Sequence, residues 1–211
     1  MAEAFRENAR FQHPLFKAIG GDVVEAAKSL IGALLTRIID KRRFFCVRIV
    51  ETEAYHQSEP GSHSYNGPTP RSQIMFGKPG FAYVYLIYGM YHCLNVVSGR
   101  EGEGAAVLIR AAEPIAAKES IFGNAEGSNS QSLPDLSGPG KLCRALGISR
   151  LHNGVDLLDV KNGQLWLEET RSIPGEISVS QRIGLSKGAA LPWRFFEEGN
   201  PNVSGGARYV R

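Results

Sequence analysis

The spacing of apolar residues predicts many strands and few helices. After Asp22 and Glu25, which resemble a capping pair, apolar residues recur near a period of 3.6, so we expect a helix over 22–32 that ends at Gly32. The remaining apolar runs are short, β-rich and follow one another without helices between them. We expect strands at 34–39, 44–55, 105–112, and near 155–160, 164–168, 177–183 and 193–196. This order favours an α+β fold over an alternating α/β fold.

Polar segments separate these elements. Residues 56–80 are rich in Gly, Pro and polar residues and predict a long ordered loop, which in a compact domain is usually functional. A short helix is expected at 141–146. Residues 117–135 have no hydrophobic period and predict a mobile loop, and residues 1–13 are expected to be flexible. A chain of 211 residues is long enough to bury its own core, so we expect one domain over 1–211.

Composition narrows the class of protein. With 43% hydrophobic and 21% charged residues, the chain is not a disordered one, and no window of ~18 apolar residues predicts a membrane span. Residues 1–13 have no apolar stretch like a secretory signal. Three widely spaced cysteines argue against a disulfide framework or a thiolate metal site, and favour a reducing, intracellular location. The net charge of +3 permits a nucleic-acid partner without requiring one.

Two carboxylates and a tyrosine end the second predicted strand. Side chains alternate along a strand, so Phe45, Val47 and Ile49 are expected to share a face with Glu51, Glu53 and Tyr55. An apolar face that continues into two carboxylates, about 7 Å apart, suggests a strand that leaves the core at a cleft. Simple solvation of strand-end acids is the alternative.

Aromatic residues are concentrated in one segment. Phe81, Tyr83 and Tyr85 alternate as on a strand, and Tyr88-Gly89 then breaks the alternation as at a hairpin tip. The alternating rings also fit a packed core face. A tyrosine beside a turn glycine projects outward, and a planar partner such as a nucleobase suits it.

Three further features invite a functional reading. Arg110 lies in an apolar strand and needs an anionic partner, which is either a structural salt bridge or a glutamate at the same cleft. Gly138-Pro139-Gly140-Lys141 precedes a helix and suits a phosphate, although it lacks the Walker A spacing and also fits an ordinary capped loop. His56 and His63 have no third ligand at a convincing spacing, so no metal site is expected.

These segments together resemble a known family. From about residue 14 to near the C-terminus, the chain is similar to the alkyladenine (3-methyladenine, methylpurine) DNA glycosylases of the vertebrate type. The motifs that carry the resemblance are, in order, Glu51-Thr52-Glu53-Ala54-Tyr55, His63-Ser64, Thr69-Pro70-Arg71, Met75-Phe76, the run from Tyr83 to Tyr91 with Asn95, Val107-Leu108-Ile109-Arg110, and the run from Gly138 to Cys143. One departure is His92, where the family pattern has phenylalanine.

The resemblance implies a single-domain fold on a curved, mainly antiparallel sheet with peripheral helices. It implies an intracellular, monomeric enzyme without a cofactor that removes alkylated or deaminated purines from double-stranded DNA, away from membranes. Carried over by position, the roles are catalysis by Glu53 and Arg110, a base pocket of Tyr55, His63, Tyr85 and Asn95, a wedge at Tyr88, and DNA contacts from Met90, Tyr91, Arg71 and Lys141.

Glycosidic-bond hydrolysis has an oxocarbenium-like transition state, so an ionised Glu53 would activate water, with Arg110 helping to hold both. Three alternatives stay open. They are a carbohydrate hydrolase using Glu51 and Glu53, a non-catalytic module that stacks bases on its tyrosines, and a helix-hairpin-helix reading of residues 133–149 with Asp156 or Asp159 as the catalytic group.

Overall fold

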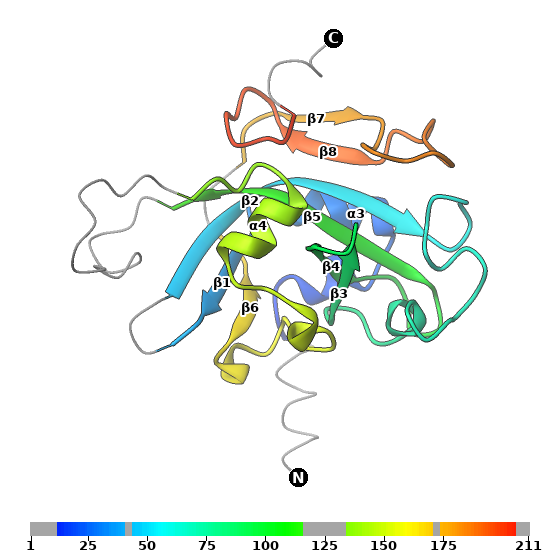
Figure 1. Ribbon diagram of the computed structural model, residues 1–211, viewed down its shortest axis with the longest axis horizontal. Helices are drawn as coiled ribbons and strands as arrows, with labels where there is room; N and C mark the ends of the chain where they lie inside the picture. Colours follow the sequence, from blue (N-terminus) through cyan, green and yellow to red (C-terminus); the bar gives the residue numbers. More distant parts are fainter. Residues whose placement is uncertain (1–11, 41–43, 116–133, 171–173, 206–211) are drawn as a thin grey trace.

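The molecule is built on a curled antiparallel sheet, in which the long strand of residues 44–56 is central (Figure 1). The computed structural model describes residues 12–40, 44–115, 134–170 and 174–205. In these ranges the helices and strands are α2 Phe16–Ile19, α3 Val23–Ser29, β1 Leu34–Ile38, β2 Phe44–His56, β3 Ala82–Ile87, β4 Tyr91–Val97, β5 Ala105–Pro114, α4 Pro139–Ala145, β6 Leu165–Glu168, β7 Ile177–Ser180 and β8 Arg194–Glu197. Three 3-10 turns complete the set, at Gln73–Phe76 (η1), Arg150–His152 (η2) and Val160–Asn162 (η3). The α+β expectation is confirmed.

The sheet has the order β3-β4-β5-β2-β1-β6, and β8 joins it through β2 while pairing with β7. One edge of β2 pairs with β5 along most of its length. The other edge pairs first with β1 and then, at residues 51–53, with β8. The end of β2 is therefore flanked on both sides by other strands, which places its two glutamates inside the sheet and not at a free edge.

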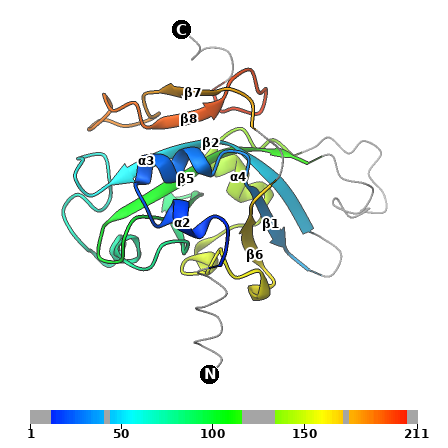
Figure 2. The same ribbon diagram turned by 180° about the vertical axis from the view of Figure 1, so that it is seen from behind.

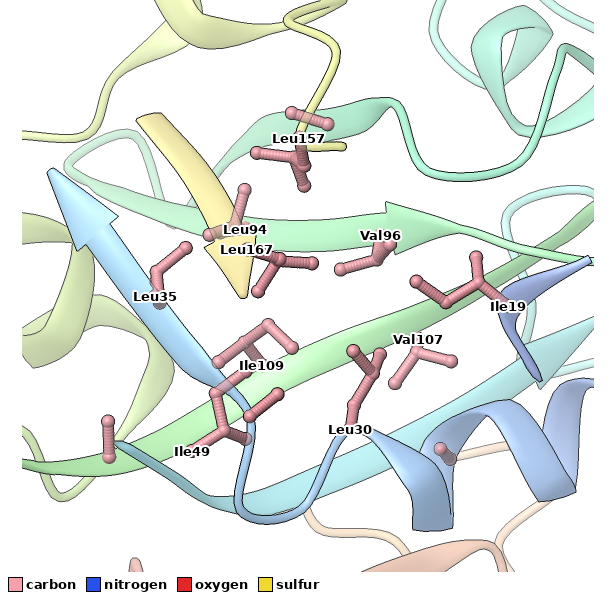
Figure 3. Packing of buried hydrophobic residues seen from close by; sticks show 14 of the residues in the cluster. Ile19, Leu30, Leu35, Ile49, Leu94, Val96, Val107, Ile109, Leu157 and Leu167 are labelled. Atoms are coloured by element: carbon pink, nitrogen blue, oxygen red, sulfur yellow. The ribbon is translucent and has the colours of Figure 1, made fainter. Parts of the chain in front are cut away.

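Helix α3 packs its buried face on β2 and β5. The Asp22 side chain accepts hydrogen bonds from the backbone N–H groups of Val24 and Glu25 (2.9 and 3.1 Å), which caps the helix as the sequence predicts. The fully buried Leu30 follows the helix, and Gly32 then turns the chain with a φ of 88°. Figure 3 shows Leu30 beside Ile49, Val107 and Ile109 in the apolar core. Helix α4 lies near the viewer in Figure 1. Figure 2 shows the molecule from behind, and there α2 and α3 lie near the viewer.

The predicted face-sharing along β2 is wrong in one respect. The pairing of β2 with β5 shifts register between Ile49 and Thr52, and it skips Val50 on β2 and Arg110 on β5. Val47 and Ile49 consequently point into the core with Ala54, whereas Glu51 and Glu53 point to the other side. A bulge turns the strand locally in this way.

Several smaller expectations differ from the structure. No strand forms at 155–160, because Asp156 and Asp159 accept hydrogen bonds from the backbone N–H groups of Leu158 and Lys161 and so favour turns. Helix α2 and strand β4 have no counterpart among the predicted elements. The expected flexible start and the mobile loop 117–135 fall almost wholly outside the described residues.

Candidate active site

A cavity of about 630 Å³ opens beside the end of β2. Its walls are mostly aromatic and apolar, with a few polar groups, as is usual for a ligand site. Many residues singled out in the sequence line it, namely Tyr55, His63, Tyr85, Tyr88, Tyr91, Asn95, Arg110 and Lys141. The wall also includes Met75, Tyr83, Cys93, Leu108, Arg144 and the segment from Ile183 to Leu185. The structure thus brings together motifs that are far apart in the chain.

Glu53 lies directly behind this wall. Its side chain is fully buried, and it is not itself among the residues that line the cavity. Three groups hold its carboxylate: the Tyr55 hydroxyl donates at 2.7 Å, the Ile183 backbone N–H donates at 2.7 Å, and the Arg110 guanidinium lies at 3.2 Å. All three residues line the cavity, so a single layer of groups separates the carboxylate from the open space.

Glu51 and Arg110 form the next part of the same network. One Glu51 oxygen accepts from the Nε atoms of Arg110 (3.0 Å) and Arg194 (2.6 Å) and from the Ser204 hydroxyl, and the other accepts from the Ser204 backbone N–H. Two buried carboxylates, Glu51 and Glu53, therefore face two buried guanidiniums. Burial alone lowers the pKa of Arg110, but the charges of Glu53 and Glu51 outweigh it and leave that pKa above its ordinary value.

This arrangement argues against the carbohydrate-hydrolase alternative. Four donors saturate Glu51, and the residue is sealed from solvent, so it has no free oxygen to offer a sugar. The helix-hairpin-helix alternative fares no better. Asp156 and Asp159 are bound within their own turns, and neither lines the cavity.

Aromatic rings and a histidine form another part of the cavity wall. His63 Nδ1 lies 2.9 Å from the Tyr83 hydroxyl, and its ring meets Tyr85 edge-on at 4.7 Å. The Arg71 guanidinium stacks over Tyr85 at 4.9 Å, although Arg71 does not line the cavity. Asn95 donates to the Tyr83 carbonyl at 3.0 Å, which fixes its side chain in the wall. Burial, more than any charge, raises the pKa of both Tyr55 and Tyr85, so these hydroxyls stay protonated.

The β3–β4 hairpin carries its aromatic tip into solvent. Tyr88 is 79% exposed, and its φ of 52° is the only positive one of a non-glycine residue in the described ranges. Gly89 follows with a φ of 71°, and the Met90 N–H bonds the Ile87 carbonyl, as in a type I′ turn. Met90 and Tyr91 are exposed beside it, at 67% and 40%. A large ring in a strained backbone position, turned away from the core, indicates a contact with something else.

The Gly-Pro-Gly-Lys segment begins α4 at the cavity rim. Gly140 packs against Tyr91, because a Cβ at this position would lie 3.2 Å from three atoms of that tyrosine. Gly138 has a φ of 151°, which favours glycine. The Lys141 ammonium is paired with Asp135 at 2.8 Å and exposed. A phosphate at Lys141 would therefore compete with this carboxylate.

The two loop histidines do not converge. His56 bonds Ser58 at 2.7 Å and Glu103 at 3.0 Å, whereas His63 contacts the tyrosines. Within the part of the chain that the structure describes, no group of three His, Cys, Asp or Glu side chains is placed to hold a metal ion. The same ranges contain no helix with the length and apolar character of a membrane span.

Sequence reasoning missed several residues of the site: Glu59, Arg144, Arg182, Ile183, Arg194 and Ser204. Arg194 had a readable signal, because it lies in the apolar run Trp193-Arg194-Phe195-Phe196 just as Arg110 lies in its strand. The contribution of Ile183 is a backbone N–H, which no side-chain pattern reveals.

Comparison with known proteins identifies the family. The family profile "Methylpurine-DNA glycosylase (MPG)" matches residues 17–201. Proteins named "Putative 3-methyladenine DNA glycosylase" are similar to most of the chain. The one from Bradyrhizobium diazoefficiens is 44% identical over 200 residues, 92% of each chain. The one from Synechococcus sp. is 43% identical over 182 residues (84% of this chain, 92% of the relative), and the one from Methanocella arvoryzae is 43% identical over 185 (86% and 90%).

A DNA glycosylase, a hydrolase of N-glycosyl bonds, is the class that these matches define. The chain belongs to the methylpurine-DNA glycosylase family. Its substrate is DNA and its process is base excision repair. The resemblance inferred from the motifs is confirmed at the level of the family, whereas the qualification "vertebrate-type" finds no support in these relatives.

The His63 ring allows a prediction about stability. Burial of the ring first, and the charge of Arg71 second, lower the pKa of His63 to about 4. An unfolded histidine titrates near 6.5, so between these values the unfolded state binds more protons and stability rises with pH. The His63 contribution is complete above pH ~6.5 and is lost as the pH falls toward 4. Urea unfolding of His63→Gln should show a shallower loss of stability between pH 6.5 and 4.5 than the wild type. An equal slope would contradict the packing of this ring.

Proposed function

We propose that this protein is a monofunctional glycosylase that flips alkylated or deaminated purines out of duplex DNA and hydrolyses the glycosidic bond with water activated by Glu53. One observation carries the proposal: the Glu53 carboxylate is held by Tyr55, Arg110 and Ile183, all of which line a cavity with flat aromatic walls. The product would be an intact abasic site.

Base flipping would use the exposed tip of the β3–β4 hairpin. A base inside a duplex is unreachable, and extruding it costs a few kcal/mol, less at a damaged or mismatched base. Tyr88 projects from the rigid turn next to the cavity and can fill the vacated stack, which recovers ~1–3 kcal/mol. Met90 and Tyr91 would lie against the duplex beside it. Arg71 and Lys141 supply positive charge for nearby phosphates.

The cavity walls suit a flat and often charged base. Alkylation at purine N3 or N7 leaves the ring cationic, and the faces of Tyr55 and Tyr85 that Arg182 and Arg71 leave free would attract such a cation by ~0.5–2 kcal/mol. This preference is modest, so much of the selectivity would come from the cationic base being a good leaving group. For a neutral deaminated purine such as hypoxanthine, a hydrogen bond from His63 or a backbone N–H would read the base edge, with Asn95 disfavouring the 2-amino group of guanine.

The chemistry would resemble glycoside hydrolysis. An ionised Glu53 accepts a proton from water and stabilises positive charge growing on the sugar. Arg110 keeps its charge next to that carboxylate and helps to orient the water. Because Glu53 itself is sealed, water reaches it only when a covering group moves aside, and Arg110, at 3.2 Å the most distant of the three, is the one we expect to move.

The remaining properties follow from this activity. We propose that the chain acts as one domain over 1–211, as a monomer without a cofactor, on chromosomal DNA inside the cell and away from membranes. Damaged purines in double-stranded DNA would be its substrate.

The first prediction of the proposed function concerns Glu53→Gln. The amide keeps the size of the side chain but cannot take a proton, so excision of hypoxanthine from a duplex should fall roughly 10²–10⁴-fold. Binding to the same duplex should persist. Single-turnover kinetics and a binding titration measure both, with Glu103→Gln, outside this cavity, as the control. Near-normal turnover would remove Glu53 from the mechanism.

A second prediction concerns the wedge. Asparagine tolerates a positive φ, so Tyr88→Asn removes the ring and retains the turn. Affinity for lesion-containing duplex should drop roughly 5–150-fold, given ~1–3 kcal/mol of stacking. Tyr65→Asn changes another exposed tyrosine, outside the cavity, and should leave affinity unchanged. Equal lesion affinity in both variants would show that Tyr88 is not the wedge.

The third prediction concerns the monofunctional mechanism. Among the described residues, Lys141 is the one lysine that lines the cavity, and Asp135 holds its ammonium. No Schiff base is therefore expected on the sugar. Borohydride added during turnover should trap no protein–DNA adduct, and a trapped adduct would assign lyase chemistry instead.

A further inference from the structure

A second buried ion pair lies outside the groups that touch Glu53. Arg182 and Glu59 form a bidentate salt bridge, a two-pronged contact with nitrogen–oxygen distances of 2.6 and 2.8 Å. The Arg182 side chain is fully buried and that of Glu59 is 5% exposed. The same guanidinium donates to the carbonyls of Ala54 and Gly188, at 2.9 Å each.

The pair joins two loops whose backbones pack closely. Glu59 accepts a hydrogen bond from the Gly61 N–H at 2.7 Å. A Cβ at Gly188 would lie 2.5 Å from a Glu59 oxygen, and a Cβ at Gly61 would lie 2.8 Å from the Lys187 carbonyl oxygen. Glycines at both positions let the loops approach, so the ion pair fixes the segment 182–188 against the segment 59–61.

Arg182 is linked to the surroundings of Glu53 at three points. It immediately precedes Ile183, whose N–H donates to the Glu53 carboxylate at 2.7 Å. Its guanidinium also lies over the Tyr55 ring at 4.6 Å, and the Tyr55 hydroxyl is the second donor to that carboxylate. The carbonyl of Ala54, between Glu53 and Tyr55 in the chain, is a third point of attachment.

We infer that Arg182 and Glu59 are positioning residues for the reaction, which act by holding the Ile183 N–H and the Tyr55 hydroxyl on Glu53. This inference deepens the proposed function and rests on the role given there to Glu53. Neither residue touches the cavity, so neither contacts the base or the sugar. Their effect is on orientation, and catalytic groups displaced by ~1 Å lose about 10²-fold in rate.

The chain offers a closely matched control. Glu197 makes the same type of contact with Arg48, at 2.6 and 3.1 Å, and it also accepts from a glycine N–H, that of Gly175, at 2.7 Å. The Glu197 side chain is 10% exposed, against 5% for that of Glu59. Neither Glu197 nor Arg48 lines the cavity. Glu59→Gln and Glu197→Gln therefore remove the same charge from similar surroundings, and only the first weakens the link to Glu53.

The experiment measures three quantities for both variants. They are the single-turnover rate of hypoxanthine excision, the affinity for a duplex with a tetrahydrofuran abasic-site analogue, and the melting temperature. For Glu59→Gln we expect the rate to fall about 10–100-fold, while the affinity stays within about twofold. The range is the one found when the hydrogen-bond partner of a metal-binding side chain is removed. For Glu197→Gln we expect the rate to stay within about twofold, even though the melting temperature falls.

Arg182→Lys tests the geometry separately. Lysine keeps the charge but not the planar two-pronged contact, so its rate should fall like that of Glu59→Gln. The double variant should be no slower than the slower single one, since both changes break one link. A wild-type rate in Glu59→Gln, or an equal loss of rate in Glu197→Gln, would overturn the inference.

These results separate the two claims. If Glu53→Gln abolishes excision and Glu59→Gln keeps the wild-type rate, the positioning role is wrong and the proposed function stands. If Glu53→Gln excises at the wild-type rate, the proposed role of Glu53 is wrong, and the inference fails with it.

Discussion

The structure depends on two carboxylates and two guanidiniums buried together at the end of β2. An isolated charge costs several kcal/mol to remove from water, so each member of this group requires the others. Glu51 is saturated by Arg110, Arg194 and the backbone and hydroxyl of Ser204. Arg110 then extends to Glu53. Glu51 thus acts as the structural anchor, and it leaves Glu53 as the carboxylate whose partners all face the cavity.

The bulge between β2 and β5 makes this division possible. A regular strand would turn Ile49 and Glu51 to the same side, and either an apolar side chain would enter the polar network or a carboxylate would enter the core. Because Val50 on β2 and Arg110 on β5 are left out of the pairing, the side chains of β2 change sides between Ile49 and Glu51. Thr52 then bonds the Ala27 carbonyl of α3, and the glutamates on either side of it face the network.

The sequence predicted most of the sheet because the periods of its apolar residues are simple and its turns carry glycine. It also indicated most of the residues that meet at the cavity, since the tyrosine run and the strand-end glutamates are unusual in themselves and match a family in order, whereas their roles stay predictions. It did not predict the bulge, because a shift of one residue in pairing leaves no mark on a single strand. Nor did it predict Ile183 or Ser204, whose contributions include backbone N–H groups, or the bond between Arg182 and Glu59, which are 123 residues apart.

Rigidity and backbone strain lie at different places in the structure. The groups around Glu53 are tied by charge pairs and hydrogen bonds, which fix the orientation of its carboxylate. Tyr88, by contrast, combines a strained backbone with an exposed ring, and both features cost stability in the free protein. In the proposed function, the type I′ turn holds the backbone of this tip in place before DNA binds, so little backbone freedom would be lost on binding. The fold therefore combines a conformational cost at the exposed tip of the β3–β4 hairpin with a network of paired charges at the carboxylate behind the cavity.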